Sequence, residues 1–239
     1  MKNLFKVLGH LLLTLLFPAE CINCQREGAW LCAKCFNKLL SNNANKDNKK
    51  DKLIITHLNE IFIAGDYDNQ LLAELIKKFK YNFFTALGDV LGDFLIMFWE
   101  KQLIERGELL TPLASTSTFS PLLIPVPLTK KRERWRGFNQ AKILAQKLEA
   151  HFSYEISYGL QRLAGAKPQA TLKEAERLHN IKNVFAWQGE SLKGQTIILI
   201  DDVVTTGATL NEAARILRQA GKSSVNKRWP KTLNKFFIN

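Results

Sequence analysis

The stretch that most constrains the fold is IILIDDVVTTGAT, residues 197–209. Its first four residues are all aliphatic, which is typical of a central parallel strand that is covered on both faces. Asp201 and Asp202 follow at the carboxyl end of this strand, which is where ligands bind in open α/β sheets. Two adjacent carboxylates repel each other unless hydroxyl groups, a divalent cation or solvent compensate them. A ribose with neighbouring hydroxyls, or Mg²⁺, would provide that compensation.

The loop after the strand has the composition of a phosphate site. Its threonines offer hydroxyl groups, and its small residues let a ligand approach the backbone amides at the start of the next helix. One such contact is worth only about 0.3–1 kcal/mol, so several must act together. The complete combination of acidic pair and loop predicts a ribose 5-phosphate ligand and disfavours an ordinary N-cap and turn. The predicted phosphate-binding residues are Thr205, Thr206, Gly207, Ala208 and Thr209.

The rest of the chain from residue 122 alternates short apolar runs with amphipathic segments. Strands are predicted over 122–127, 154–159 and 196–200, and helices over 140–152 and 209–221. This order predicts an α/β fold, with a parallel sheet between helices. Upstream, residues 53–68 are strand-like, 70–81 and 84–104 are predicted helices, and 111–121 form a loop.

The four cysteines form two CxxC pairs in CINCQREGAWLCAKC. Two such turns can close a tetrahedron of thiolates around one structural zinc ion. The alternative is a pair of disulfides in a secreted protein, but the lack of other cysteines favours a reducing compartment and a cytoplasmic protein. The predicted zinc ligands are Cys21, Cys24, Cys32 and Cys35.

The apolar N-terminus imitates a signal peptide without its cleavage site. It is too short for a membrane span, so a helix over 4–17 that ends before Pro18 is predicted. These elements divide the chain into an N-terminal helix with a zinc-ribbon-like module (1–40), a polar linker (41–52), an α/β domain (53–225) and a divergent basic tail (226–239).

Positive charge is a further constraint on partners. The chain has 34 lysines and arginines against 22 acidic residues, a net charge of +12 that attracts polyanions or serves solubility alone. Five basic residues lie in KKRERWRGFNQ, with Trp135 and Phe138 between or beside them. Such a segment can bind pyrophosphate through arginines, bind single-stranded nucleic acid by charge and stacking, or form a solvated basic loop.

Residues 197–209 resemble the PRPP-binding motif of type I phosphoribosyltransferases, where PRPP is 5-phosphoribosyl 1-pyrophosphate. The stretch from Pro125 is similar to the P-V-P…R…RGFNQ segment of the ComF family of competence-associated phosphoribosyltransferase-like proteins, with Arg132 and residues 136–140 on the pattern. The double CxxC module and LIKKFKY, residues 75–81, also resemble that family. A family segment R…Q…R…N…F resembles Arg162, Gln169, Arg177, Asn180 and Phe185.

The resemblance implies a type I phosphoribosyltransferase-like fold and roles for the matched residues. Asp201 and Asp202 would contact the ribose hydroxyls, directly or through water and Mg²⁺, and Arg132 and Arg136 would hold pyrophosphate. The reaction implied is transfer of phosphoribosyl from PRPP to an unknown acceptor. The alternatives are a non-catalytic single-stranded DNA-binding factor of transformation, in contact with DNA-uptake proteins, and a PRPP sensor.

One departure from the family lies at the C-terminus. The family has another apolar strand after the phosphate-loop helix, whereas this chain runs into NKRWPKTLNKFFIN. Pro230 and the lysines argue against a central strand here. The last strand is therefore expected to be short, replaced or lost.

Overall fold

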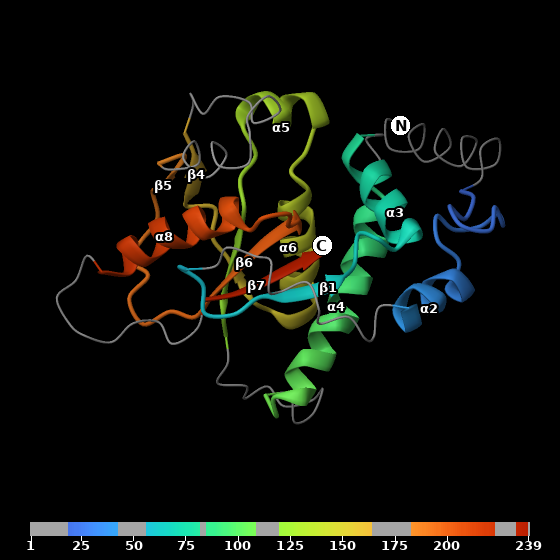
Figure 1. Cartoon of the computed structure of the whole chain (residues 1–239), viewed down its shortest axis with the longest axis horizontal. Coiled ribbons are helices and arrows are strands. Elements are labelled where there is room, and N and C mark those ends of the chain that lie inside the picture. The colour runs from blue at the N-terminus through green and yellow to red at the C-terminus, as the bar shows by residue number, and fades with distance from the viewer. Residues whose placement is uncertain are drawn as a thin grey trace, which may run out of the picture.

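A parallel sheet lies at the centre of the fold (Figure 1). The computed structural model describes residues 19–42, 56–81, 85–108, 120–163, 183–222 and 233–238. The elements in chain order are α2 (Ala33–Asn42), β1 (Phe62–Gly65), α3 (Gln70–Tyr81), α4 (Leu87–Glu105), β2 (Leu122–Pro125), α5 (Lys130–Arg136), α6 (Gln140–Phe152), β3 (Glu155–Ile156), β4 (Leu160–Arg162), β5 (Phe185–Trp187), β6 (Ile197–Val203), α8 (Ala208–Lys222) and β7 (Leu233–Ile238). Five strands form the sheet in the order β1-β7-β6-β2-β3, each parallel to its neighbours, while β4 and β5 form a separate antiparallel ribbon.

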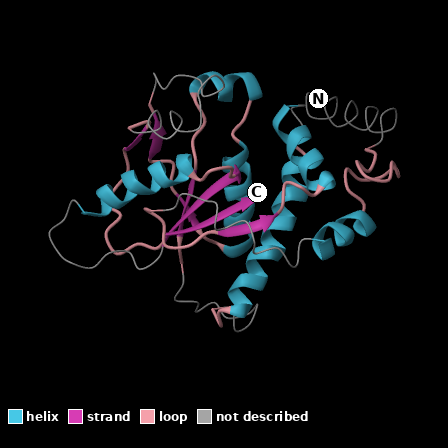
Figure 2. Cartoon of the chain, viewed as in Figure 1, coloured by secondary structure: helices cyan, strands magenta, loops and turns pink. Residues whose placement is uncertain are grey.

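Both faces of the sheet are covered, because alternate residues of a strand point to opposite sides. Ile198 and Ile200 of β6 belong to a buried cluster that includes residues of α3, α4 and α6. Ile197 and Leu199 belong to a second cluster, which includes residues of α8 and of the β4–β5 ribbon. Figure 2 shows the sheet between these helices. The predicted α/β architecture, with a central strand over these residues, is confirmed.

The cysteine-rich module is attached to the first cluster. Cys21, Leu31, Cys35 and Leu39 are buried together with side chains of α3 and α4. The amphipathic helix α2 begins within the second CxxC pair and ends at Asn42. Within the described ranges, none of the helices combines the length and the hydropathy needed to cross a bilayer.

The basic segment after β2 is a helix and not the loop that its composition suggested. The Thr129 side chain accepts a hydrogen bond from the Arg132 amide and caps α5, and Gly137 ends the helix with a φ of 78°. This helix has seven residues and no apolar periodicity, so hydrophobic patterning could not reveal it.

The C-terminal tail supplies a strand of the sheet. β7 begins after Pro230 and pairs in parallel with β6 on one side and β1 on the other. The expectation that this segment could not make a central strand was therefore wrong, and residues 233–238 belong to the α/β domain. The proline does not interfere because it precedes the strand, so no ladder hydrogen bond is lost.

Several predictions lie outside the described residues. They are the helix over 4–17, the linker beyond Asn42, most of the loop over 111–121, and the family positions Gln169, Arg177 and Asn180.

Candidate functional site

The acidic pair lies near the C-terminal end of β6, at the carboxyl edge of the sheet. Asp201 and Asp202 are both half-buried, and the Asp202 amide donates a hydrogen bond of 2.9 Å to the Asp201 carboxylate. The strand extends to Val203, so the pair lies within β6 and not after it. Their position at this edge is the one that the preceding aliphatic run predicted.

Lys80 compensates one of the two carboxylates. This residue lies in the last turn of α3, and its Nζ is 3.1 Å from Asp202 Oδ1. The two side chains are only 15% and 13% exposed, so the ion pair is largely shielded from water. The sequence analysis did not find Lys80 as a site residue, because nothing local shows that α3 reaches the end of β6.

The predicted phosphate loop connects β6 to α8 as expected. Gly207 has a φ of 76°, which favours glycine, and its carbonyl accepts hydrogen bonds from the amides of Leu210 and Asn211. Thr206 Oγ1 lies 3.4 Å from the Ala208 amide and acts as a weak helix cap. Thr205 is exposed. The loop therefore has a capping role, and it presents a threonine to solvent at the start of a helix of 15 residues.

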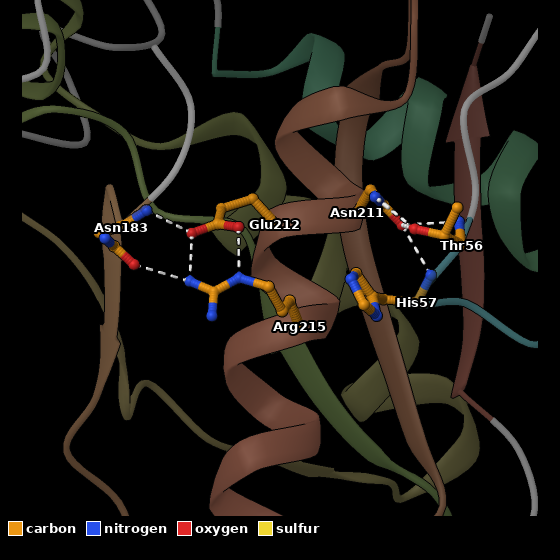
Figure 3. Close-up of polar contacts among 6 residues, drawn as sticks. All are labelled: Thr56, His57, Asn183, Asn211, Glu212 and Arg215. Atoms are coloured by element: carbon orange, nitrogen blue, oxygen red, sulfur yellow. Dashed lines mark hydrogen bonds and ion pairs between the residues drawn. The ribbon is translucent and has the colours of Figure 1, made fainter. Parts of the chain in front are cut away.

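The first turns of α8 are fixed by polar contacts on both sides, as Figure 3 shows. On one side the Asn211 side chain accepts hydrogen bonds from the amides of Thr56 (2.9 Å) and His57 (2.8 Å). On the other side the buried Glu212 carboxylate accepts from the Asn183 amide (2.6 Å) and from Arg215 Nε (2.7 Å). These contacts hold the helix that follows the phosphate loop against segments distant in the sequence.

Arg162, at the end of β4, faces the same site. Burial is the main reason that its pKa is lowered, the positive charge of Arg132 lowers it further, and the charge of Asp201 opposes both. Its guanidinium lies 5.3 Å from the centre of the Phe185 ring. The structure thus brings both Arg132 and Asp201 within electrostatic range of Arg162. The family resemblance had marked Arg162 without assigning a role to it.

Arg162 also carries a buried donor without a hydrogen-bond partner. In the part of the chain that the structure describes, three buried side-chain nitrogens lack a hydrogen-bond partner: Arg136 Nε, Gln140 Nε2 and Arg162 Nε. All three are donors, and a buried donor without an acceptor is costly. An anion would provide the missing acceptor for Arg162, where a second arginine also lies nearby.

Arg136 has a different setting from Arg132. It is only 9% exposed, its Nη1 donates to Gln140 Oε1 (3.0 Å), and its guanidinium lies 5.4 Å from the Tyr81 ring. Phe138 packs against Phe79 of α3 at 5.4 Å. These contacts fasten the end of α5 to α3 and α6, so Arg136 has an evident structural role.

The four cysteine sulfurs lie within 4.8 Å of one another. Cys24 Sγ and Cys32 Sγ are 3.7 Å apart, close to the edge of about 3.8 Å that four sulfurs at 2.3 Å from a zinc ion would have. Burial raises the pKa of Cys21, but hydrogen bonds from the backbone of Cys32, Cys24 and Asn23 outweigh it and lower the pKa to about 6. The Asn23 side-chain Nδ2 donates to Cys35 Sγ at 3.1 Å. The residues therefore fit a closed structural zinc site.

Sequence comparison matches the C-terminal half of the chain to a known domain. Residues 135–226 match the sequence model of the Phosphoribosyl transferase domain, a range that contains β6, the phosphate loop and Arg162. The chain is 43% identical over 116 residues to Competence protein ComFC of Bacillus subtilis, an alignment of 46% of each protein. It is 35% identical over 106 residues to Competence protein F of Haemophilus influenzae (43% of this chain, 46% of that one).

A third relative is DNA utilization protein YhgH of Escherichia coli K12, with 34% identity over 105 residues, 43% of this chain and 45% of that one. The matched region spans about half the length of each of these relatives. No solved structure matches the chain significantly.

Proposed function

Because the chain belongs with the ComF family of competence-associated phosphoribosyltransferase-like proteins, we propose that it binds PRPP at the carboxyl end of β6. The observation that carries the proposal is the placement of the acidic pair beside a helix-initiating threonine loop, with Arg162 in electrostatic range of both Asp201 and Arg132. Asp201 and Asp202 contact the ribose hydroxyls, and residues 205–209 hold the 5-phosphate.

The proposed reaction is transfer of phosphoribosyl to an acceptor. The bond between C1 of the ribose and the pyrophosphate breaks, pyrophosphate leaves with the bonding electrons, and an acceptor nucleophile forms the new bond to C1. Positive charge develops on the ribose, where the carboxylates of Asp201 and Asp202 stabilise it. Arg132 and Arg162 stabilise the departing pyrophosphate. The contacts of Arg136 with Gln140 and Tyr81 also hold α5 in place, and its predicted contact with pyrophosphate stays a prediction.

Two metal ions complete the proposal. Mg²⁺ bound together with PRPP would supply positive charge to the departing pyrophosphate, whose oxygen atoms are ligands of the type that it prefers. A zinc ion held by the four cysteines stabilises the N-terminal module without taking part in chemistry, because all four positions are filled by sulfur.

Calorimetry tests the ligand site. PRPP with Mg²⁺ is expected to bind the wild type, and an Asp201→Ala, Asp202→Ala double variant is expected to lose that binding. Unchanged binding in the double variant would contradict the site. A screen for pyrophosphate release across candidate acceptors then separates a transferase from a PRPP sensor, which binds without turnover.

A second candidate function is the binding of single-stranded DNA during uptake, in the cytoplasm and together with proteins of the uptake machinery. The observation in its favour is an exposed aromatic pair: Tyr81 and Trp135 are 53% and 57% exposed, and their ring centres lie 5.8 Å apart beside the basic helix α5. Exposed aromatic rings among cations can stack on unpaired bases.

The DNA candidate is tested with oligothymidylate and an abasic strand of the same length. Trp135→Ala should weaken binding of the first and not of the second, since only the first offers bases. Arg132→Ala and Arg134→Ala should weaken both and reduce the salt dependence. Equal affinities for the two strands in the wild type would exclude stacking at this pair.

A further inference from the structure

Lys80 is held at the acidic pair by the packing of its helix. Its neighbours in the last turn of α3 are fixed: Phe79 packs on Phe138, and the Tyr81 ring contacts that of Trp135. Lys80 itself is 15% exposed, whereas Lys78 in the same turn is 38% exposed and pairs with Glu74 on the surface. Lysines are rarely buried to this degree unless they are paired with an acid. The packing of α3 therefore holds Lys80 beside Asp202.

The charge of Lys80 changes what the acidic pair can bind. Two ionised carboxylates present two negative charges to a ligand that is itself strongly anionic, such as a sugar carrying phosphate and pyrophosphate. With Lys80 Nζ 3.1 Å from Asp202 Oδ1, the charge of Asp202 is balanced in a largely shielded place. Repulsion of an anionic ligand is reduced accordingly, and so is the attraction of the pair for a divalent cation.

We propose that Lys80 is a positioning and specificity-determining residue, a resident cation on Asp202 that lets the site accept a phosphorylated sugar without a divalent ion on the aspartates. The proposal deepens the proposed function and rests on it for the identity of the ligand. Mg²⁺ bound to the phosphates of the ligand is compatible with it; Mg²⁺ bound to Asp202 in the absence of ligand is not.

Binding of Mn²⁺ alone tests the proposal without any sugar. Mn²⁺ takes the oxygen ligands that Mg²⁺ takes, and its free fraction is measured by electron paramagnetic resonance. The wild type is expected to show no Mn²⁺ site that depends on Asp202, so that Asp202→Asn leaves its binding curve unchanged. Lys80→Met is expected to bind Mn²⁺ at least about tenfold more tightly than the wild type does. Asp202→Asn introduced into the Lys80→Met protein should abolish this gain.

Matched variants separate charge from folding. Lys80→Arg retains the cation and should behave as the wild type, and Lys80→Gln should behave as Lys80→Met. Lys78→Met removes an equal charge from the surface of α3, two residues before Lys80, and should change nothing. A wild-type Mn²⁺ site that Asp202→Asn abolishes would overturn the proposal, and this measurement does not require any Lys80 variant to fold.

A second readout uses PRPP. In buffer without added divalent cations, Lys80→Met is expected to bind PRPP about tenfold or more weakly than the wild type, and Mg²⁺ should recover most of the difference. An equal dependence on Mg²⁺ in the two proteins would contradict the proposal. If the wild type binds no PRPP at all, the proposed function fails, whereas the Mn²⁺ result still decides the role of Lys80.

Discussion

Substitution of Arg162 by methionine should have opposite effects on stability and on ligand binding. The guanidinium is largely buried, Arg132 lies within electrostatic range of it, and its Nε has no hydrogen-bond partner. A side chain selected for stability alone would not combine these features. An arginine that binds an anionic ligand would combine them, because the ligand supplies the acceptor and the opposite charge.

The stability change follows from what the substitution removes. Relief of the orphaned Nε is worth about 1–3 kcal/mol. The lost interaction with the Phe185 ring offsets this by about 0.5–1 kcal/mol, and methionine retains most of the apolar contact. The free energy of unfolding of the free protein should therefore rise by about 1 kcal/mol, equivalent to about 2–4 °C in Tm for a domain of this size.

The change in binding has the opposite sign. Loss of one hydrogen bond to a charged group costs about 1.5–3 kcal/mol, so the Kd for PRPP should increase by about 10- to 150-fold. Thermal unfolding of the free protein gives the first quantity, and calorimetric titration with PRPP gives the second.

Arg106 provides the matched control. Its guanidinium also lies over a phenylalanine, 4.6 Å from the Phe62 ring, but it has an ion-pair partner in Glu60. Arg106→Met should lower stability by about 0.5–1 kcal/mol and leave PRPP binding intact. If instead Arg162→Met is destabilising and binds PRPP normally, Arg162 is a structural arginine and the reasoning fails.

Three other measurements test the remaining structure. Protein purified without added metal should contain about one zinc ion per chain and lose it in Cys24→Ser; zinc-free protein with disulfides would contradict the module. The Glu212 carboxylate joins Arg215 to the Asn183 backbone amide, so Glu212→Gln should lower the free energy of unfolding in urea by about 1.5–3 kcal/mol. A double-mutant cycle with Arg215→Met should show a coupling energy above about 0.5 kcal/mol. A chain ending at residue 232 should lose cooperative thermal unfolding because β6 and β1 both lose a neighbour, and a retained wild-type Tm would contradict an internal β7.

Local patterns predicted the parts of the fold whose cause is local. The helix predicted over 140–152 is α6 with the same bounds, because its apolar residues follow the helical period and the Asn139 side chain caps its first turn. The central strand was evident from four consecutive aliphatic residues. Strand order has no such local signal. β7, with the sequence LNKFFI, lies between β1 and β6, and nothing in these six residues selects those two neighbours.

The same contrast between local and tertiary causes applies to the candidate site. The acidic pair and the threonine loop are contiguous in the sequence, so one motif predicted both. Lys80 and Arg162 come from elements whose approach to the site depends on tertiary packing, and their neighbours in sequence give no indication of it. A search for partners of the acidic pair could have considered the basic residues of LIKKFKY, but it could not have chosen Lys80 over Lys78.

The position of Lys80 indicates that the matched domain does not contain all of the proposed site. The range 135–226 includes the acidic pair and Arg162, but Lys80 lies on α3, upstream of it, and β7 lies downstream. Helix α3 is held in place through Phe79 and the first buried cluster, which also includes Cys21 and Cys35 of the N-terminal module. A disturbance of the cysteine module can therefore reach Lys80 through continuous packing, without either cysteine approaching the ligand. Loss of zinc should accordingly weaken PRPP binding most when no Mg²⁺ is added, because the charge of Lys80 then has no substitute.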